Sequence, residues 1–263
     1  LKDAGFSGIE ISAGHGHLFH QFMSSWSNQR EDMYGGDLLG RTRFTRDLIT
    51  AIRAATSGDF IIGIKLPGSD NVADSIDVAE AHSIATVIAE TGEVDYWTFC
   101  KGAHANSLHE HLPTAHGKRA PYIGEITSLR QVAPNIPAGA LGYITDPNEA
   151  EHILENGLDL VMLGRAMITD PAWGIKVEQG READIRYCVS CNTCWRTLIE
   201  AGQLKCDNNP RIAKPDEADW YPKKTAYKKN VVIVGAGIAG MEAAWVAGAR
   251  GHKVTVLGKS QQI

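Results

Sequence analysis

The chain has 263 residues, of which 43% are hydrophobic, and a formal net charge of -5. Its acidic and basic residues are mixed along the sequence, which argues against a nucleic-acid partner, and no apolar run is long enough to predict a membrane span. The length allows one large domain or two smaller ones. Because the chain starts at Leu1 without methionine, in a stretch typical of a helix end, we expect an internal fragment of a longer protein.

Residues 1–180 alternate between patterns typical of strands and of helices. Strands separated by helices predict βαβ units and an α/β fold with a parallel sheet. The pattern fits an open doubly wound sheet or the later part of a (β/α)8 TIM barrel, and both place functional residues at the carboxyl ends of strands. The expected strands are Gly8–Ile11, Phe60–Leu66, Val94–Cys100, Ile136–Leu141 and Leu158–Leu163, and the expected helices are Phe44–Ala55, Val78–Ala89 and Asn148–Glu155.

Residues suited to binding or proton transfer follow several of these strands. His15 and His17 come after the first strand, Lys65 lies at the second, and Gly164-Arg165 follows the fifth. Glycine lets backbone N–H groups approach a phosphate, and a neighbouring arginine adds a charge-assisted fork. The Gly164-Arg165 pair therefore predicts a phosphate site, with an ion pair to a carboxylate on the barrel rim as the alternative.

The loop after the third strand carries four histidines, which are His104, His109, His111 and His116. Imidazole is a common metal ligand, but histidine has many other uses in loops. The pattern favours a surface loop over a metal site.

Four of the five cysteines lie close together, as Cys188, Cys191, Cys194 and Cys206. Two consecutive C-x2-C spacings followed by a remote fourth cysteine are typical of an iron–sulfur cluster, so we expect a [4Fe-4S] site. Structural zinc and two disulfides are the alternatives. A thiolate-bound metal survives best in a reducing compartment, which favours a cytoplasmic protein.

Residues 210–229 are polar and rich in proline and lysine, as expected of a segment between domains. A buried strand then leads into Gly235-x-Gly237-x-x-Gly240, an alanine-rich helix and a second strand. This order predicts the start of a Rossmann-like domain that binds FAD or another adenine dinucleotide. Gly258 stands where an acidic residue usually holds the ribose hydroxyls.

The stretch GIEISAGHGHLFHQFMSSWSNQREDMYGGDLLGRTRF resembles the signature of old yellow enzyme-type flavin barrels. Together with the cysteines, it is similar to the branch that contains trimethylamine dehydrogenase and 2,4-dienoyl-CoA reductase. The resemblance implies FMN in the barrel, one [4Fe-4S] cluster and a following dinucleotide-binding domain. By this resemblance, residues 1–180 hold strands four to eight of the FMN barrel. Residues 181–229 hold the cluster segment and a linker, and residues 230–263 begin the dinucleotide-binding domain.

By this resemblance Lys65 lies near the flavin ring, where a cation stabilises the reduced anionic flavin. Gly142, Gly164 and Arg165 correspond to the FMN phosphate site. His17 stands where enoyl-reducing members carry a proton-donating tyrosine, and His15 precedes it on the same loop. We expect His17 to act as a base and His15 to orient the substrate.

The resemblance to dimethylglycine demethylase-like members implies oxidative N-demethylation of a methylated amino acid or small methylamine. Ala103 replaces the aspartate that amine dehydrogenases of this branch carry after strand six. The expected electron partner is an acceptor protein or NAD(P). The alternatives are an NAD(P)H-dependent enoyl or 2,4-dienoyl-CoA reductase and a non-catalytic electron-transfer fragment.

Overall fold

A computed structural model describes residues 1–56, 58–200 and 202–259. The chain divides into two compact units, Leu1–Ile212 and Ala213–Ile263. All four clustered cysteines belong to the first unit. In the part of the chain that is described, no helix is long and apolar enough to cross a membrane.

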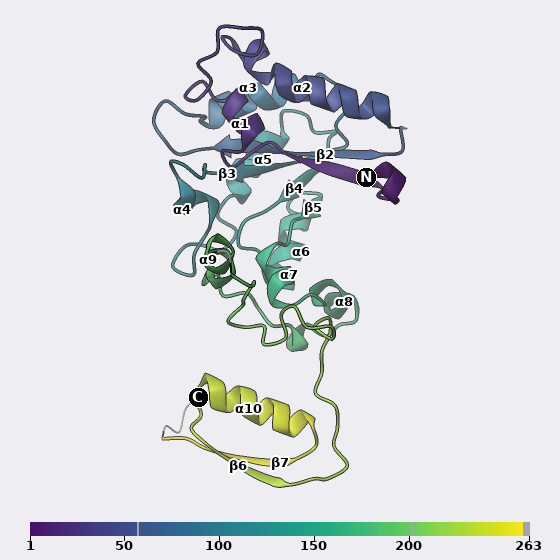
Figure 1. Cartoon of the computed structure of the whole chain (residues 1–263), viewed down its shortest axis with the longest axis vertical. Coiled ribbons are helices and arrows are strands. Elements are labelled where there is room, and N and C mark those ends of the chain that lie inside the picture. The colour runs from purple at the N-terminus through teal and green to yellow at the C-terminus, as the bar shows by residue number, and fades with distance from the viewer. Residues whose placement is uncertain (57, 201, 260–263) are drawn as a thin grey trace. The chain divides into compact units, whose positions relative to one another are not determined.

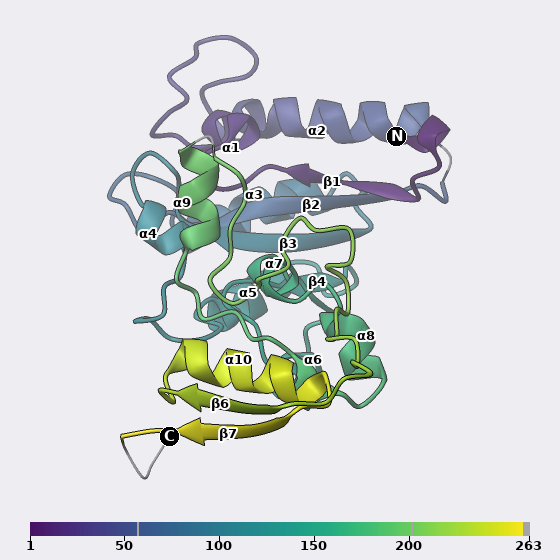
Figure 2. The same cartoon turned by 60° about the horizontal axis from the view of Figure 1, so that its bottom comes forward.

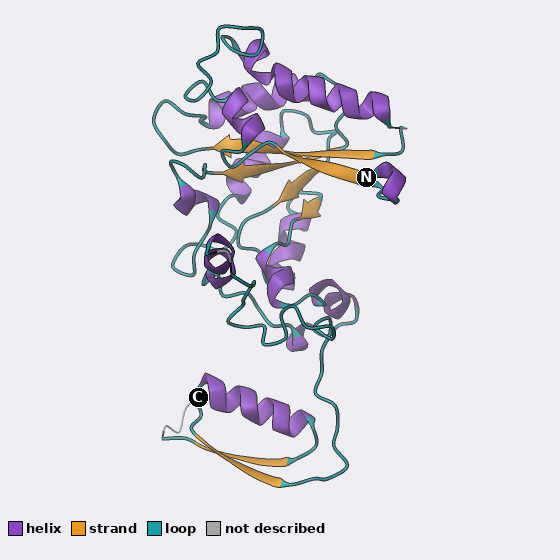
Figure 3. Ribbon diagram, viewed as in Figure 1, coloured by secondary structure: helices purple, strands orange, loops and turns teal. Residues whose placement is uncertain are grey.

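The first unit is organised around a five-stranded parallel sheet (Figures 1 and 3). Each strand pairs with the next strand along the chain, in the order β1-β2-β3-β4-β5. A doubly wound sheet reverses its strand order at a switch point, whereas a barrel does not, so this order identifies part of a TIM-type barrel. The strands are β1 (Gly8–Ser12), β2 (Ile61–Ser69), β3 (Tyr96–Lys101), β4 (Ala138–Ala140) and β5 (Leu160–Val161).

Helices connect these strands and pack on one face of the sheet, where α3 contacts β2 and α5 contacts β4 (Figure 1). Aspartates begin the two long helices, since Asp37 accepts a hydrogen bond from Gly40 N and Asp77 from Glu80 N. The described helices of this unit are η1 (Lys2–Ala4), α1 (Leu18–Met23), α2 (Leu38–Ala55), α3 (Val78–Ala89), α4 (Leu108–His111), α5 (Ile123–Arg130), α6 (Pro147–Glu155), α7 (Arg165–Thr169), α8 (Trp173–Glu178), η2 (Glu182–Asp184) and α9 (Thr193–Ile199).

The core lies between the sheet and these helices. One row of register partners runs across four strands as Ile11, Ile64, Trp97 and Ala138, and each is at most 4% exposed. They belong to one hydrophobic cluster with helix residues such as Ile84. Burial of this row on the helix-covered face stabilises the sheet and holds its register, because a slip of one residue would reverse every side chain.

The adjacent row of register partners is Ser12, Lys65, Thr98 and Gly139. Because successive strand residues point to opposite faces, these four lie on the face away from the helices. The apolar pattern thereby directs Lys65 to the inner face of the barrel sheet.

The expected elements are present, and several differ in extent from the prediction. Helix α2 begins at Leu38 rather than Phe44, because Asp37 caps it. Strand β2 continues to Ser69, through Pro67, with a register irregularity between Pro67 and Ser69. Strands β4 and β5 are shorter than the apolar runs that predicted them.

The segment that follows the barrel strands, still within the first unit, packs back against the loops at the ends of the strands. Helix α9 begins within the cysteine cluster and lies beside α4, which carries His111 (Figure 2). In the second unit β6 (Asn230–Val234) pairs in parallel with β7 (Lys253–Leu257), and α10 (Ile238–Ala249) packs on both strands.

Candidate active site

The first histidine loop leaves β1 and turns back at once over the end of the sheet. Ala13 N donates to Lys65 O at 2.9 Å, which ties the loop to β2. His15 has a φ of 59° and Gly16 a φ of 80°, so the chain takes two left-handed residues in succession. This tight turn places His15 and His17 above the carboxyl ends of the strands.

The second histidine loop leaves β3 and docks against the first. His104 N donates to His15 O at 3.1 Å. A Cβ atom at Gly102 would lie 2.7 Å from both His111 N and Ser107 O, so only glycine permits this turn. The two loops are joined through their backbones before any side chain is considered.

These loops assemble a cluster of rings that we call the histidine cluster, made of His15, His17, His104 and His111 together with Trp195 from α9. The His15 and His111 rings stack with centroids 3.6 Å apart, and His104 stacks on His111 at 4.6 Å. His17 meets His104 edge-on at 4.9 Å. Trp195 stands nearly perpendicular to His104, at 89° and 5.5 Å.

Burial keeps the inner imidazoles neutral. It lowers the pKa of His15 to about 3, with further lowering by His111 and Lys65. It lowers the pKa of His111 to about 4, helped by His104. The pKa of His104 is lowered by burial and by His17. At neutral pH these rings therefore offer one acceptor and one donor nitrogen each.

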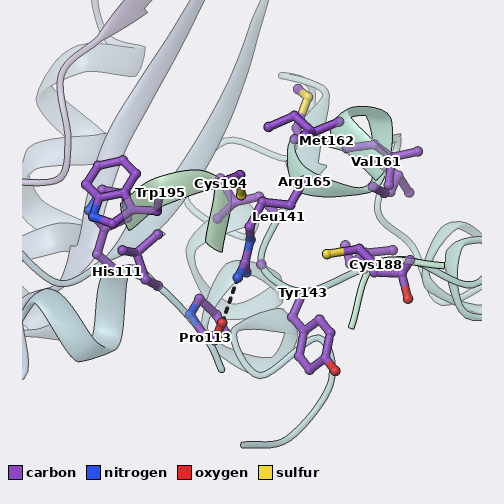
Figure 4. Close-up of a pocket in the computed structure, with 18 of the residues that line it drawn as sticks. His111, Pro113, Leu141, Tyr143, Val161, Met162, Arg165, Cys188, Cys194 and Trp195 are labelled. Carbon is purple, nitrogen blue, oxygen red and sulfur yellow. Dashed lines mark hydrogen bonds between the residues drawn. The ribbon is translucent and has the colours of Figure 1, made fainter. Parts of the chain in front are cut away.

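A cavity of about 500 Å³ opens beside the histidine cluster at the carboxyl ends of the strands (Figure 4). This volume is within the range of cofactor and ligand sites. Its described lining contains two permanent cations, Lys65 and Arg165, and no aspartate or glutamate. Loops at β1, β4 and β5 and the cysteine segment all contribute to its wall.

Gly142 and Gly164 line this cavity where β4 and β5 end. Gly142 has a φ of 101°, and a Cβ there would lie 2.5 Å from the Tyr122 ring. Gly164 has no atom within 4 Å of its Cβ position, so its backbone is open to the cavity side of the loop. Backbone of this kind is suited to a phosphate, which is the group that the sequence predicts here.

Arg165 begins α7, and its side chain reaches towards the histidine loop and the cysteine loop (Figure 4). Its Nη1 donates to Pro113 O at 2.8 Å, to Ser190 Oγ at 2.7 Å and to Asn192 Oδ1. The alternative of an ion pair with a rim carboxylate does not occur among the described residues. Its remaining donors make no hydrogen bond to those residues, so a phosphate role for them stays a prediction.

Lys65 forms an ion pair within the barrel face. Its Nζ lies 2.9 Å from Glu10 Oε1, and the Tyr96 hydroxyl donates to Glu10 Oε2 at 3.2 Å. Burial, followed by the Glu10 charge, raises the pKa of Tyr96 to about 12, so the phenol keeps its proton. Lys65 lines the cavity and is held in place by this pair, and its role beside a bound flavin ring stays a prediction.

The four cysteines of the cysteine segment are free thiols, and Cys100 is also a free thiol. Cys194 is buried, whereas Cys191 is exposed. Burial raises the pKa of Cys194, and the neighbouring Cys188 and Cys206 thiols raise it further, so these three lie near one another. The disulfide alternative therefore finds no support in the structure.

Within the described residues, no three or more histidine, cysteine or acidic side chains are arranged to hold a single metal ion. Tetrahedral zinc would hold its four sulfurs within about 4 Å of one another. A cubane cluster takes one thiolate on each iron and spaces them more widely. The four thiols fit that donor set chemically, and the [4Fe-4S] site stays a prediction.

The second unit presents the predicted glycine turn between β6 and α10. Gly235 has a φ of 105°, and Gly237 is the residue before the first turn of α10. A Cβ at Gly240 would lie 1.8 Å from Gly235 O, so the third glycine permits the close approach of turn and helix. Gly258 directly follows β7.

Sequence reasoning predicted His15, His17 and Lys65 near one another but left His104, His111 and Trp195 out of the site. His109 and His116 are exposed and lie outside the histidine cluster, as expected of a surface loop. The tight turn at Gly102 is the sequence signal that could have distinguished His104 and His111, which lie in the cluster, from His109 and His116, which do not. No local signal marks Trp195, because its role depends on where α9 docks.

Comparisons with known proteins agree with this architecture. Residues 1–184 match the NADH:flavin oxidoreductase / NADH oxidase family. The chain is 34% identical over 260 residues to a Rhizobium meliloti protein named "Probable N-methylproline demethylase", covering 97% of this chain and 38% of that protein. It is 34% identical over 270 residues to "N,N-dimethylglycine/sarcosine dehydrogenase" of Chromohalobacter salexigens, covering 100% of this chain and 38% of that protein.

A solved structure of 2-naphthoyl-CoA reductase in complex with 2-naphthoyl-CoA superposes with a TM-score of 0.90 at 29% identity. The superposition covers 100% of this chain and 40% of that one. This chain thus spans about two fifths of the length of the relatives it matches. The family match, the sequential parallel sheet and the shared fold lead to one conclusion: the chain belongs to the NADH:flavin oxidoreductase / NADH oxidase family, the FMN-dependent, old yellow enzyme-type oxidoreductases.

Proposed function

We propose that this chain carries the catalytic centre of a flavin-dependent enzyme that oxidatively removes an N-methyl group from a methylated amino acid or small methylamine. The observation that carries the proposal is the histidine cluster beside the cavity, in which His17 stands where the resemblance places the tyrosine of enoyl-reducing members. An imidazole takes up a proton near neutral pH, whereas a phenol serves as a proton donor. Two relatives with names that denote oxidation of N-methylated amino acids support the same direction.

The residues fit FMN, although its contacts are part of the proposal. Gly142, Gly164 and Arg165 would hold the phosphate, and Lys65 would lie beside the ring. Bound FMN would supply an acceptor for the hydride that leaves the N-methyl carbon. The chain's own work is to hold the amine and to remove its proton, because the nitrogen lone pair must be free to form the C=N bond.

His17 is the base in this proposal, and His15 orients the substrate. The ammonium proton passes to a ring nitrogen of His17, the methyl carbon loses a hydride, and the resulting iminium carbon takes up water. The products are formaldehyde and the amine with one methyl group fewer. His17 suits proton release because it is exposed, whereas the stacked His15, His104 and His111 behind it are half-buried.

Cys188, Cys191, Cys194 and Cys206 are the proposed ligands of a [4Fe-4S] cluster, which would carry electrons away one at a time. The glycine turn at Gly235, Gly237 and Gly240 is the proposed site of FAD or another adenine dinucleotide. Electrons would then leave to an acceptor protein or to NAD(P), in a reducing, cytoplasmic setting.

The second candidate is an NAD(P)H-dependent enoyl or 2,4-dienoyl-CoA reductase, with electrons running in the opposite direction. The similarity to the 2-naphthoyl-CoA reductase structure favours it. It requires a proton donor over the substrate, and burial makes His15 and His111 weak donors because they are neutral at pH 7.

The decisive experiment is anaerobic flavin reduction by N,N-dimethylglycine, compared with oxidation of NADPH in the presence of an enoyl-CoA. Amine-driven reduction in the wild type, lowered about 10²- to 10⁴-fold in His17→Phe, is the expected result for the loss of a general base. His116→Phe is the matched control, because His116 is an exposed histidine outside the histidine cluster. Equal rates for His17→Phe and wild type across neutral pH would remove His17 from the mechanism. Enoyl-CoA reduction without amine oxidation would favour the second candidate.

A further inference from the structure

The histidine cluster contains four buried polar atoms that have no hydrogen-bond partner among the described residues. They are Nδ1 of His15, Nε2 of His104, Nδ1 of His111 and Nε1 of Trp195. An unpaired buried polar atom destabilises the folded protein, so native proteins seldom gather several of them. Gathered around a cavity, such atoms indicate a polar group that binds there.

The charges around the cavity indicate the sign of that group. Lys65 and Arg165 line the cavity, and both lower the pKa of His111. The described lining has no acidic side chain, so an ammonium group would find no counter-charge there. Lys65 is paired with Glu10, and Arg165 is assigned to the FMN phosphate, so a carboxylate would be held by the unpaired N–H donors, which stabilise a bound anion.

Trp195 gives this site a donor that cannot become an acceptor. An indole Nε1–H only donates, whereas each neutral imidazole offers one donor and one acceptor. The Trp195 ring lies 5.6 Å from the His111 ring and 5.5 Å from the His104 ring, so its N–H lies among the other unpaired atoms of the histidine cluster (Figure 4). Helix α9 holds Trp195 in place, next to the buried Cys194.

We propose that His111 and Trp195 form the part of the substrate site that binds a carboxylate, which makes the enzyme selective for N-methylated amino acids over simple methylamines. This inference rests on the proposed amine oxidation and narrows its substrate class. The carboxylate accepts the Trp195 indole N–H and an imidazole N–H of His111. The amine end of the same molecule is then left for the His17 side of the histidine cluster.

Two non-reactive probes test binding without turnover. Glycine betaine and choline share a trimethylammonium group, which has no lone pair for the proposed oxidation. They differ in that betaine carries a carboxylate where choline carries a hydroxymethyl group. Calorimetric titration of the purified holoenzyme should give a tighter Kd for betaine, by tenfold or more. Trp195→Phe keeps an aromatic ring and removes the N–H, so the betaine Kd should rise about 10- to 100-fold, the range for a hydrogen bond to a charged group. The choline Kd should change less than twofold.

The controls keep the outcomes distinct. Trp26→Phe changes an indole that is 49% exposed and should leave both affinities as they are. His111→Asn is a second variant of the site and should weaken betaine in the same selective way, should Trp195→Phe fail to fold. Equal affinities for betaine and choline, or equal losses of both in Trp195→Phe, would overturn the inference.

Substrate reactivity separates this inference from the function on which it rests. If N,N-dimethylethanolamine reduces the flavin as well as N,N-dimethylglycine does, amine oxidation stands and the carboxylate site is wrong. If neither amine reduces the flavin while betaine still binds selectively, the carboxylate site stands and amine oxidation is wrong.

Discussion

Gly14 allows the first histidine loop to pack directly on the end of β3. A Cβ atom at Gly14 would lie 2.1 Å from Cys100 Sγ, and the next atoms, in the Leu66 backbone, would lie 3.4 Å and 3.5 Å away. The steric conflict is therefore with one sulfur atom. Cys100 is 2% exposed, so its side chain has little room to turn aside. We expect Gly14→Ala to displace the loop that carries His15.

The size of the effect follows from the same contact. Adding a methyl group to a well-packed core costs about 1–3 kcal/mol. Cys100→Ala removes the sulfur atom, so the new methyl at Gly14 would then meet only ordinary contacts. The unfolded chain also loses freedom when alanine replaces glycine, which offsets part of any remaining cost. The double-mutant cycle should therefore show a coupling of about 1–3 kcal/mol between the two positions.

The four proteins of this cycle are compared by the midpoint of thermal unfolding of the holoenzyme and by the rate of flavin reduction. Each kcal/mol of destabilisation lowers the midpoint by about 2–4 °C in a chain of this size. Gly124→Ala is the control, because Gly124 lies in α5 and has no atom within 4 Å of its Cβ position. If Gly14→Ala lowered the unfolding midpoint by the same amount in the wild type and in Cys100→Ala, the packing argument would be refuted.

Three further predictions follow from the site. Gly142→Ala should reduce the flavin-to-protein ratio by more than half, because Gly142 needs both its φ of 101° and the space beside the Tyr122 ring; Gly174→Ala, with no neighbour within 4 Å, should retain flavin. Cys191→Ala should remove iron and sulfide but leave the flavin reducible by amine, and stoichiometric zinc without iron in the anaerobically purified wild type would contradict the cluster assignment. Stability should fall as pH decreases from about 6.5 to about 3, because over this range the unfolded chain binds a proton at His15 that the folded chain, with a His15 pKa of about 3, does not. His15→Asn should reduce this loss when unfolding is measured as a function of pH.

Much of this protein could be read from local pattern. Short apolar runs identified the strands, because a parallel strand that is buried on both faces is apolar along most of its length. Spacing alone marked the cysteines from Cys188 to Cys206 and the Gly235 turn, since ligand loops and phosphate turns are built from neighbouring residues. Apolar spacing predicts α2 only from Phe44, whereas the helix begins at Leu38, because Asp37 caps it and apolar periodicity does not register a cap.

Sequence by itself therefore determined the strands, the position of Lys65 at the second strand and two of the four clustered histidines. Only the tertiary structure decided the strand order, the partners of Arg165 and the union of His15 with His111 and Trp195. The physical reason is that these contacts join segments far apart in the chain, where neither periodicity nor spacing carries information. A turn at Gly102 and the docking of α9 bring these rings to one cavity, and both depend on packing that exists only once the sheet has formed.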